Sequence, residues 1–435
     1  MMFLWWTQLW LVVVLVHGVV AKFGFVKDQS MDEVFPGPVY RQDPSLPEGH
    51  MRPLGWQRRP DGPITEQLEV PAAKEFYEQY VRANSPVVFR NAVSDAPVFT
   101  TWQEDKYLIE KYGNLDVEVR HRSVRKRDRI ETTEEIIKFK KFLYDYMYDD
   151  CYLATAIPTP MMQELPFPKC VRCGTIGKSL ISAHLWMSSG GTSSLIHSHD
   201  NHLLYCVLFG RRDFILIDRS HKKYVDFVED YPGSLSGHSN INTYRLNMYA
   251  FKNIGRVPWI WSTLYPGDCI FVPAGYIHHV RSLGRSLSLT IEFATMVDFD
   301  DTGCTLIEED FAPLSDASFL LTFNKGILRL SKTPVSAEDV RHLLVLLMGK
   351  EGILTINKFE KFYNRVIAHG NQDSQAQRLF YNLISEEEES QVTIMDLMNI
   401  PIENLQEIAD IISSAYGDLV PEEEGHNRFN LHEEF

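Results

Sequence analysis

Two short segments of this chain carry histidines with the spacing of a mononuclear metal site. Residues 195–200 read Leu-Ile-His-Ser-His-Asp, and residues 273–280, about eighty positions later, contain His278 and His279. Two imidazoles and one carboxylate that converge on one face of a β-barrel are the usual ligands of a non-haem Fe(II) site. His197 and His278 are therefore predicted metal ligands, whereas His279 alternates with His278 and is predicted to face outward.

The third ligand has two candidates, because His199 stands two residues after His197 and Asp200 follows it. Side chains at 197 and 199 share one face of a strand, and Asp200 points to the other face unless a β-bulge intervenes. His199 is the better ligand by geometry, and Asp200 is the better one by chemistry. Three neutral imidazoles bind Zn, Cu, Ni and Fe alike, and metal affinity would weaken as pH falls through the histidine range.

The histidines lie in a region that is predicted to be rich in β-structure. From about residue 115 to 300, short apolar runs alternate with Gly, Pro and Asp turns, which is typical of a β-sandwich or barrel. The predicted strands of the chain are residues 85–90, 115–119, 151–156, 182–186, 202–209, 214–217, 268–272 and 287–293. Residues 22–64 indicate an extended arm, and helices are predicted near 71–81 and 102–112.

Three longer motifs in this region resemble one known family. They are residues 186–197, 203–217 and 264–278, and each combines a strand-like apolar run with a glycine turn. In this order they resemble a JmjC (cupin-like) domain of the Fe(II)/2-oxoglutarate hydroxylase type, with similarity over roughly residues 65–296. The resemblance implies a double-stranded β-helix (jelly roll) with flanking helices, over residues 65–300, that holds Fe(II) and 2-oxoglutarate.

The resemblance also implies roles for three further side chains. Arg212, fifteen residues after the first histidine, stands where the family usually has a lysine that meets the C5 carboxylate of 2-oxoglutarate. An arginine keeps this charge and can hold a carboxylate through two hydrogen bonds. Tyr152 and Ser194 match positions that help to hold the cosubstrate. Two positions depart from the family, because His199 replaces the acid and Leu203 replaces an asparagine.

Two interpretations follow from these matches and departures. The first is a lumenal Fe(II)- and 2-oxoglutarate-dependent dioxygenase that hydroxylates a protein side chain. The second is a catalytically impaired JmjC pseudoenzyme that serves as a binding or scaffold protein, which the joint changes at His199 and Leu203 favour. The substrate is not named by the sequence, because specificity depends on loops such as 120–135 and 219–262.

The last third of the chain indicates a separate all-α domain. Over residues 315–415 a helix–turn–short strand–helix pattern occurs twice, which is the outline of a paired EF-hand. With Gly352 as position 6, the first loop has Lys358 at position 12, where a calcium loop needs a carboxylate. The second loop has Asp396 at position 12 but lacks the glycine. Calcium binding is therefore not expected, and this EF-hand-like module is predicted to serve for packing or partner contact, followed by an acidic tail over 416–435.

The N-terminus and the composition bear on location and partners. Residues 1–21 are almost wholly apolar and end in small residues, which is typical of a cleaved secretory signal peptide; a membrane anchor is the alternative. After cleavage no membrane span is predicted. The net charge of −15 over 435 residues argues against a nucleic-acid partner. We therefore expect a protein substrate or binding partner in the secretory pathway, in the endoplasmic-reticulum lumen or outside the cell.

Two further features concern the secretory route. Residues 432–435 read His-Glu-Glu-Phe and resemble the retrieval signal of endoplasmic-reticulum residents, with Phe in place of Leu. Secretory entry would expose the six cysteines to oxidising conditions. Cys170 and Cys173 are predicted to close a local loop through a disulfide. Cys206 and Cys269 lie in apolar strands and are predicted to be core residues.

Overall fold

The structure is a computed structural model of the chain. It describes residues 35–37, 43–125, 129–230, 234–304, 311–324, 327–331, 334–348, 352–364, 372–385 and 389–417. The predicted signal peptide, the predicted retrieval signal and all but the first two residues of the acidic tail lie outside these ranges. Within them, no helix has both the length and the apolar character that crossing a membrane requires.

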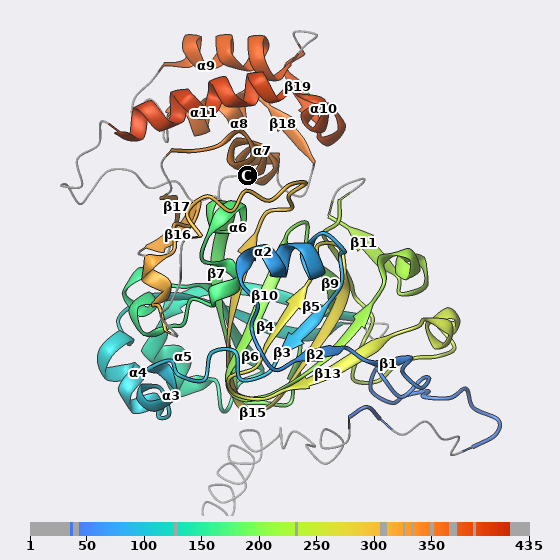
Figure 1. Cartoon of the computed structure of the whole chain (residues 1–435). Helices are drawn as coiled ribbons and strands as arrows, with labels where there is room; N and C mark the ends of the chain where they lie inside the picture. The colour runs from blue at the N-terminus through green and yellow to red at the C-terminus, as the bar shows by residue number, and fades with distance from the viewer. Residues whose placement is uncertain are drawn as a thin grey trace, which may run out of the picture.

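Two long strands organise the N-terminal part of the molecule (Figure 1). The first half of β10 (His202–Ile217) pairs with β14 (Cys269–Val272), and its second half pairs with β13 (Ile260–Leu264). Both halves also pair with β15 (Ile277–Phe293), and the register shifts near Phe209. Such irregularities bend a strand, so each long strand contributes to two layers of a β-sandwich.

Glycine permits the bend in β10. Gly210 has φ +76°, and a Cβ at this position would lie 2.5 Å from the carbonyl oxygen of Arg285. No other residue type fits both the backbone conformation and this close approach. Arg212 follows two residues later, so the bend decides which face of the strand carries its side chain.

The two layers share β10 and β15 and are otherwise built from different strands. The first layer adds β14, β2 (Thr65–Gln67), β3 (Val87–Phe89), β4 (Asp116–Arg125), β5 (Arg129–Lys138), β6 (Cys151–Ala156) and β7 (Leu180–Ser188). The second layer adds β13, β1 (Gly62–Pro63), β8 (Thr192–Ser193), β9 (Ile196–Ser198), β11 (Phe227–Glu229) and β12 (Gly237–Ser239). The predicted β-sandwich with flanking helices is confirmed.

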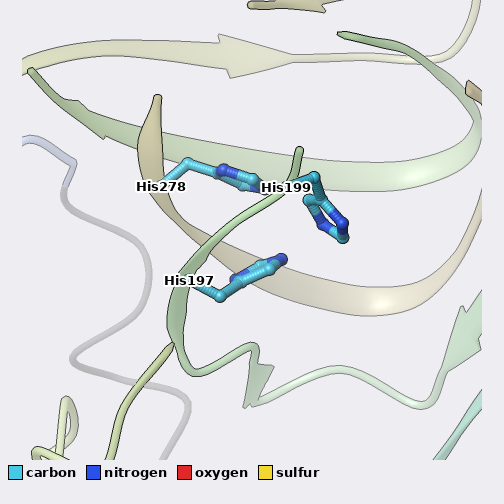
Figure 2. Close-up of side chains that lie close together, drawn as sticks. All are labelled: His197, His199 and His278. Atoms are coloured by element: carbon cyan, nitrogen blue, oxygen red, sulfur yellow. The ribbon is translucent and has the colours of Figure 1, made fainter. Parts of the chain in front are cut away.

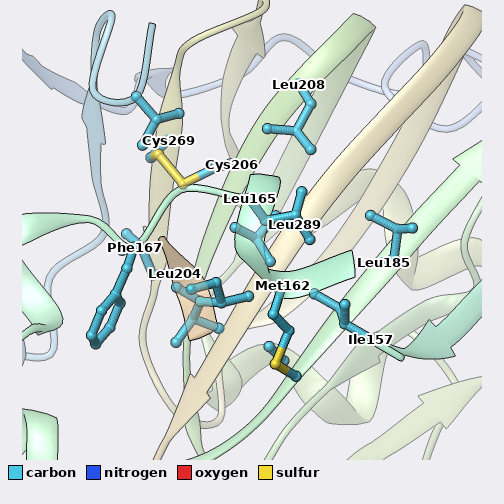
Figure 3. Close-up of a cluster of buried hydrophobic side chains, with 14 of the residues drawn as sticks. Ile157, Met162, Leu165, Phe167, Leu185, Leu204, Cys206, Leu208, Cys269 and Leu289 are labelled. Carbon is cyan, nitrogen blue, oxygen red and sulfur yellow. A yellow bond between two sulfur atoms is a disulfide. The ribbon is translucent and has the colours of Figure 1, made fainter. Parts of the chain in front are cut away.

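Short helices cover the outer face of the first layer. They are α2 (Ala73–Phe76) with its continuation η2 (Tyr77–Val81), α3 (Val98–Thr101), α4 (Asp105–Tyr112) and α5 (Phe139–Asp145). Their apolar side chains join the outward-facing residues of the strands in one large core, part of which is drawn in Figure 3. The opposite face of these strands is left to line the interior of the sandwich, where the histidines lie.

The cysteines pair differently from the prediction. Cys173 is bonded to Cys304 across 131 residues, and the local Cys170–Cys173 bond is therefore wrong. Cys170 keeps a thiol because its side chain is fully buried in the apolar core, away from Cys304. Cys206 and Cys269 are core residues as predicted, and they are also bonded to each other, since they stand opposite one another in β10 and β14 (Figure 3).

Residues 120–125 and 129–135 form strands where the sequence predicts a loop. They belong to β4 and β5, which pair along ten residues each at the edge of the first layer. Charged side chains are frequent in both segments, which suits strands at the edge of a sheet. The hairpin carries Arg120 toward the interior of the sandwich, next to β6.

The C-terminal part repeats a helix–strand–helix unit. Its elements are α7 (Ala337–Met348), β18 (Ile353–Thr355), α8 (Ile356–Phe362), α9 (Asp373–Leu379), η10 (Phe380–Ile384), β19 (Gln391–Thr393), α10 (Ile394–Asn399) and α11 (Ile402–Gly417). Because β18 and β19 pair antiparallel, the predicted all-α domain is a mixed one. A hairpin of β16 (Leu321–Asn324) and β17 (Ile327–Leu330) precedes it. We call residues 337–417 the C-terminal module.

The C-terminal module rests on the sandwich through apolar and polar contacts. Ile181 of β7 and Ala294, just after β15, belong to the same buried cluster as the helices of the module. His342 of α7 also forms a 2.8 Å hydrogen bond through Nε2 with Oδ1 of Asn201. Asn201 precedes β10 and lies two residues after His199, so the module touches the turn that follows the histidine motif.

Candidate metal centre

Three histidines from two parts of the chain gather inside the sandwich (Figure 2). His197 lies on β9 and His278 on β15, where the two are direct cross-strand partners. His199 follows β9 by one residue. One ring nitrogen from each lies within 4.8 Å of the others, and the ring centroids of His197 and His278 are 4.1 Å apart. This spacing suits three imidazole ligands around one metal ion.

Backbone contacts orient two of the three imidazoles. The Nδ1 atom of His197 lies 2.8 Å from the carbonyl oxygen of Leu195, and Nδ1 of His278 lies 3.0 Å from that of Tyr276. In a neutral imidazole Nδ1 must donate to such a carbonyl, which leaves the lone pair on Nε2. Histidines that bind a metal through Nε2 generally donate their Nδ1–H to such a partner, which fixes the orientation of the ring.

The environment of the cluster keeps the imidazoles neutral. Burial lowers the pKa of His197 from 6.5 to about 4 and that of His199 to about 3, and neighbouring histidines add to the lowering. Burial also lowers the pKa of His278 well below its usual range. A neutral imidazole is the form that binds metal, so competition from protons should begin at lower pH than the ordinary histidine range.

Asp200 lies outside the cluster. Its carboxylate accepts hydrogen bonds from the backbone N–H groups of Leu235, at 2.6 Å, and Ser236, at 3.1 Å. The hydroxyl of Ser234 donates to both carboxylate oxygens at 3.1 Å. Of the two candidates for the third ligand, the structure brings His199 to the other histidines and uses Asp200 to hold the turn at residues 234–236.

Arg212 is a buried cation with neutral partners. Its guanidinium donates to the hydroxyls of Ser282 and Ser288 and to the carbonyl oxygen of Trp186, at 3.1 Å for Ser288 and 3.3 Å for Trp186. Among the described residues it has no acidic partner, and burial lowers its pKa. Ser282 and His278 lie four residues apart on β15 and therefore on the same face, so the guanidinium shares the interior with the triad. A buried cation of this kind fits a carboxylate ligand.

The other two predicted cosubstrate residues lie at the edge of this space. Tyr152 of β6 stands opposite Arg120 of β4, and the two side chains interact. The charge of Arg120 in turn influences His197, which places the tyrosine near the triad. The hydroxyl of Ser194 accepts a 2.9 Å hydrogen bond from the backbone N–H of Val280 and keeps its own proton free to donate elsewhere.

Sequence reasoning missed several neighbours of the triad. Besides Arg120, the charges that influence His197 or His199 come from His184, Asp230 and His238. These residues come from different strands and turns, and no spacing in the sequence connects them with the histidine motifs. A strand pattern around His238 could have indicated this neighbour of the triad, but β12 has only three residues, which is too few to identify a strand from the sequence.

The first loop of the C-terminal module holds a cation of its own. The ammonium of Lys358, at loop position 12, donates to the carbonyl oxygens of Met348 and Ile353, at 3.1 and 3.4 Å. Ile353 is position 7, which supplies a backbone carbonyl ligand in calcium-binding loops. In the second loop, Asp396 accepts hydrogen bonds from Thr393 and caps α10. Both position-12 side chains are therefore engaged in contacts within the chain.

Comparison with known proteins agrees with the architecture of the sandwich. The family described as "Cupin-like domain" matches residues 72–299, which is more than half of the chain. The chain belongs to the cupin-like domain family. The matched residues include both long strands, the triad and Arg212, and they end before the C-terminal module of this family member.

Individual relatives of this cupin-like protein are distant in sequence. Jumonji C domain-containing protein 5 of Drosophila melanogaster is 24% identical over 241 residues, which cover 52% of this chain and 58% of that protein. Lysine-specific demethylase JMJ30 of Arabidopsis thaliana is 26% identical over 229 residues, with 49% and 51% covered. Lysine-specific demethylase 8 of Xenopus tropicalis is 21% identical over 235 residues, with 52% and 51% covered.

The matches to these relatives indicate a class of reaction but cover only part of each protein. The chain spans little more than half the length of the curated relatives it matches. At the level of the family, the relatives support an oxygenase of the Fe(II)- and 2-oxoglutarate-dependent type.

Proposed function

We propose that this chain is an Fe(II)- and 2-oxoglutarate-dependent oxygenase that hydroxylates a protein side chain in the secretory pathway. One observation carries the proposal. Three neutral imidazoles converge in the same interior as a buried guanidinium that has no acidic partner among the described residues. Such an enzyme requires a metal-ligand set together with a cation that can bind a carboxylate.

The residues of the chain would divide the work in a simple way. Fe(II) together with 2-oxoglutarate supplies oxidation of a C–H bond when both are bound. His197, His199 and His278 would hold the metal through their Nε2 atoms. Arg212 would bind and orient the far carboxylate of 2-oxoglutarate, with Tyr152 and Ser194 as hydrogen-bond partners. The apolar side chains that line the rest of the interior would exclude water.

The location and the substrate class rest on separate arguments. Two disulfides suit an oxidising compartment, in keeping with the signal peptide expected at residues 1–21. Both the Arabidopsis thaliana and the Xenopus tropicalis relatives described above are named as lysine-specific demethylases, a name that denotes action on a protein side chain. A chain in the lumen would not meet chromatin, so we propose hydroxylation of a lumenal or secreted protein in place of histone demethylation.

The test uses the purified full-length chain, reconstituted with Fe(II) without oxygen. We expect bound iron, and succinate formed from 2-oxoglutarate when oxygen is admitted. Arg212→Ala should weaken 2-oxoglutarate binding by about 100-fold, because a buried charge partner is removed. Arg212→Lys, which keeps the charge, should retain part of the affinity. Absence of 2-oxoglutarate binding by the iron-loaded parent would contradict the proposal.

A catalytically impaired protein with a binding or scaffold role is the second candidate. It is favoured by the two altered positions, because His199 stands for the acid and Leu203 is buried in the apolar lining of the interior. His199→Asp distinguishes the candidates. Turnover that is present in the parent supports the oxygenase. Metal and 2-oxoglutarate binding without turnover, together with turnover gained in His199→Asp, would support the scaffold.

A further inference from the structure

The hairpin of β11 and β12 places two more polar residues beside the triad. His238 of β12 is the direct cross-strand partner of His197, so both side chains lie on the same face. Val228 of β11 is the partner of His238 on its other side. Asp230 lies two residues beyond Val228, and the 3.3 Å hydrogen bond from its N–H to the carbonyl of Ser236 continues the ladder. By strand alternation, Asp230 shares the face of His238 and His197.

Side-chain contacts agree with this placement. Oδ1 of Asp230 lies 3.7 Å from Nδ1 of His238, and Oδ2 accepts a 2.6 Å hydrogen bond from the hydroxyl of Ser236. Glu229, whose side chain points to the other face, is held by Arg219 and Lys222. The two acids of the hairpin therefore face opposite ways, and Asp230 is the one turned toward the triad.

Asp200 fixes the second leg of this hairpin. Its contacts with residues 234–236 are the ones described above, and Ser236 is the residue that holds Asp230. The aspartate beside the histidine motif thus anchors the turn that brings another aspartate to the same site. The position two residues after His197 carries no carboxylate, and Asp230 brings one to the neighbourhood from a different element.

We infer that Asp230 is the carboxylate of this metal centre: from its place beside His238, on the face that carries His197, it acts through space and supplies the negative charge that three neutral imidazoles lack. The inference deepens the proposed function and rests on its metal centre. A +2 ion in a partly buried site gains from a nearby anion. A carboxylate that contacts a metal ligand typically contributes 10- to 100-fold to metal affinity, and Asp230, which contacts His238, is expected to contribute no more than the lower end of that range.

The electrostatic direction supports this geometry. Burial lowers the pKa of His197 and His199, and the Asp230 charge acts against that lowering on both residues. A carboxylate that favours positive charge on these imidazoles also favours a cation bound between them. Asp230 and His238 are about two-fifths exposed, so solvent screening puts the expected effect at the lower end of the range.

The experiment measures Co(II) affinity of the full-length chain by its visible absorption, without 2-oxoglutarate or turnover. Asp230→Asn keeps the shape and removes the charge, and we expect about tenfold weaker binding at low salt. The difference should shrink at about 0.5 M salt, which a purely structural role would not produce. Asp230→Glu should restore most of the affinity.

Asp226→Asn is the matched control, because it removes the same charge from an exposed position just before β11. It should leave Co(II) affinity unchanged. Equal affinity of the parent and Asp230→Asn, or an equal loss in both asparagine variants, would overturn the role of Asp230 while leaving the metal centre intact. A parent chain that binds no Co(II) at pH 7 would overturn the metal centre and the proposed function with it.

Discussion

The sandwich and the C-terminal module differ in how their candidate ligand groups are used. In the sandwich, three neutral imidazoles lie in the same interior as the guanidinium of Arg212, which has no acidic partner among the described residues. In the module, the ammonium of Lys358 occupies the carbonyl oxygens of its own loop. One region presents a candidate binding site, and in the other a side chain of the chain itself fills the loop. The residue type at a ligand position therefore decides whether a loop of this outline is closed by a bound ion or by the chain's own lysine.

The largest effect is expected when one histidine of the triad is removed. His278→Ala should lower Co(II) or Fe(II) affinity by more than about 100-fold, since losing a direct ligand should exceed the cost of an outer-shell change. Metal content by mass spectrometry and Co(II) absorption would measure the loss. His221→Ala, a histidine outside the triad on a surface turn, is the control and should keep the metal. Retention of metal by His278→Ala would place the site elsewhere.

The second largest effect is expected from acid, which should lower the metal affinity of the triad. The triad pKa values lie below 6.5, so the folded imidazoles stay neutral and metal affinity should hold from pH 7 to about 5. Below the lowered values, affinity should fall by about tenfold per pH unit for each imidazole that must lose a proton. Equilibrium dialysis across pH 4–7 gives the curve. A fall that is already complete at pH 6 would contradict the lowered values.

The lowered pKa values of the triad also make the stability of the folded protein depend on pH. Because the unfolded histidines take up protons first, near pH 6.5, the contribution of the neutral triad is fully present above that value. It is lost as pH falls toward about 4 for His197 and about 3 for His199. Metal-free protein should therefore unfold more easily at pH 5 than at pH 7. Urea unfolding of His278→Ala, which lacks one of these groups, should depend less on pH in this window.

The module should respond to loss of its internal cation by losing stability. Lys358→Ala leaves the carbonyl oxygens of Met348 and Ile353 without this donor, at a cost of about 1–2 kcal/mol in free energy of unfolding. Urea unfolding monitored by circular dichroism measures it. Lys361→Ala, an exposed residue of the same helix α8, should change stability very little. Equal changes in the free energy of unfolding of the two variants would mean that the contacts of the Lys358 ammonium do not stabilise the loop.

The smallest effect is expected where the two regions meet. His342→Ala removes the hydrogen bond to Asn201, and we expect about 1 kcal/mol or less in stability with metal affinity nearly unchanged. His342→Gln, which can still donate to Asn201, should recover much of the loss. A large drop in Co(II) affinity in His342→Ala would instead mean that the module sets the position of His199 through the turn that they share.

Strand alternation explains how much of the site could be predicted. The period of a strand predicts that His197 and His199 share one face and that Asp200 points to the other, and the structure places them in this way. Arg212 required the family resemblance, because its direction depends on the bend at Gly210. Such local rules need only neighbours in the sequence.

The remainder depends on contacts between distant segments. The Cys173–Cys304 bond joins residues 131 positions apart, and only the path of the intervening chain brings them together. The pairing of β11 and β12, two three-residue strands, brings Asp230 beside His238, and such short strands carry too little pattern to be recognised in the sequence. The sequence identified Lys358 as an unsuitable calcium ligand, but it did not indicate that the ammonium would bind the loop carbonyls.

The Cys173–Cys304 bond has a consequence for how the chain would survive proteolysis. It closes a covalent ring that contains the whole histidine triad, Arg212 and the Cys206–Cys269 bond. A single cut between residues 173 and 304 opens the ring but releases no fragment, so both cut ends stay attached to the same molecule. A protein nicked once in this stretch would migrate as one species until its disulfides are reduced, with all three histidines of the triad still tethered to the sandwich.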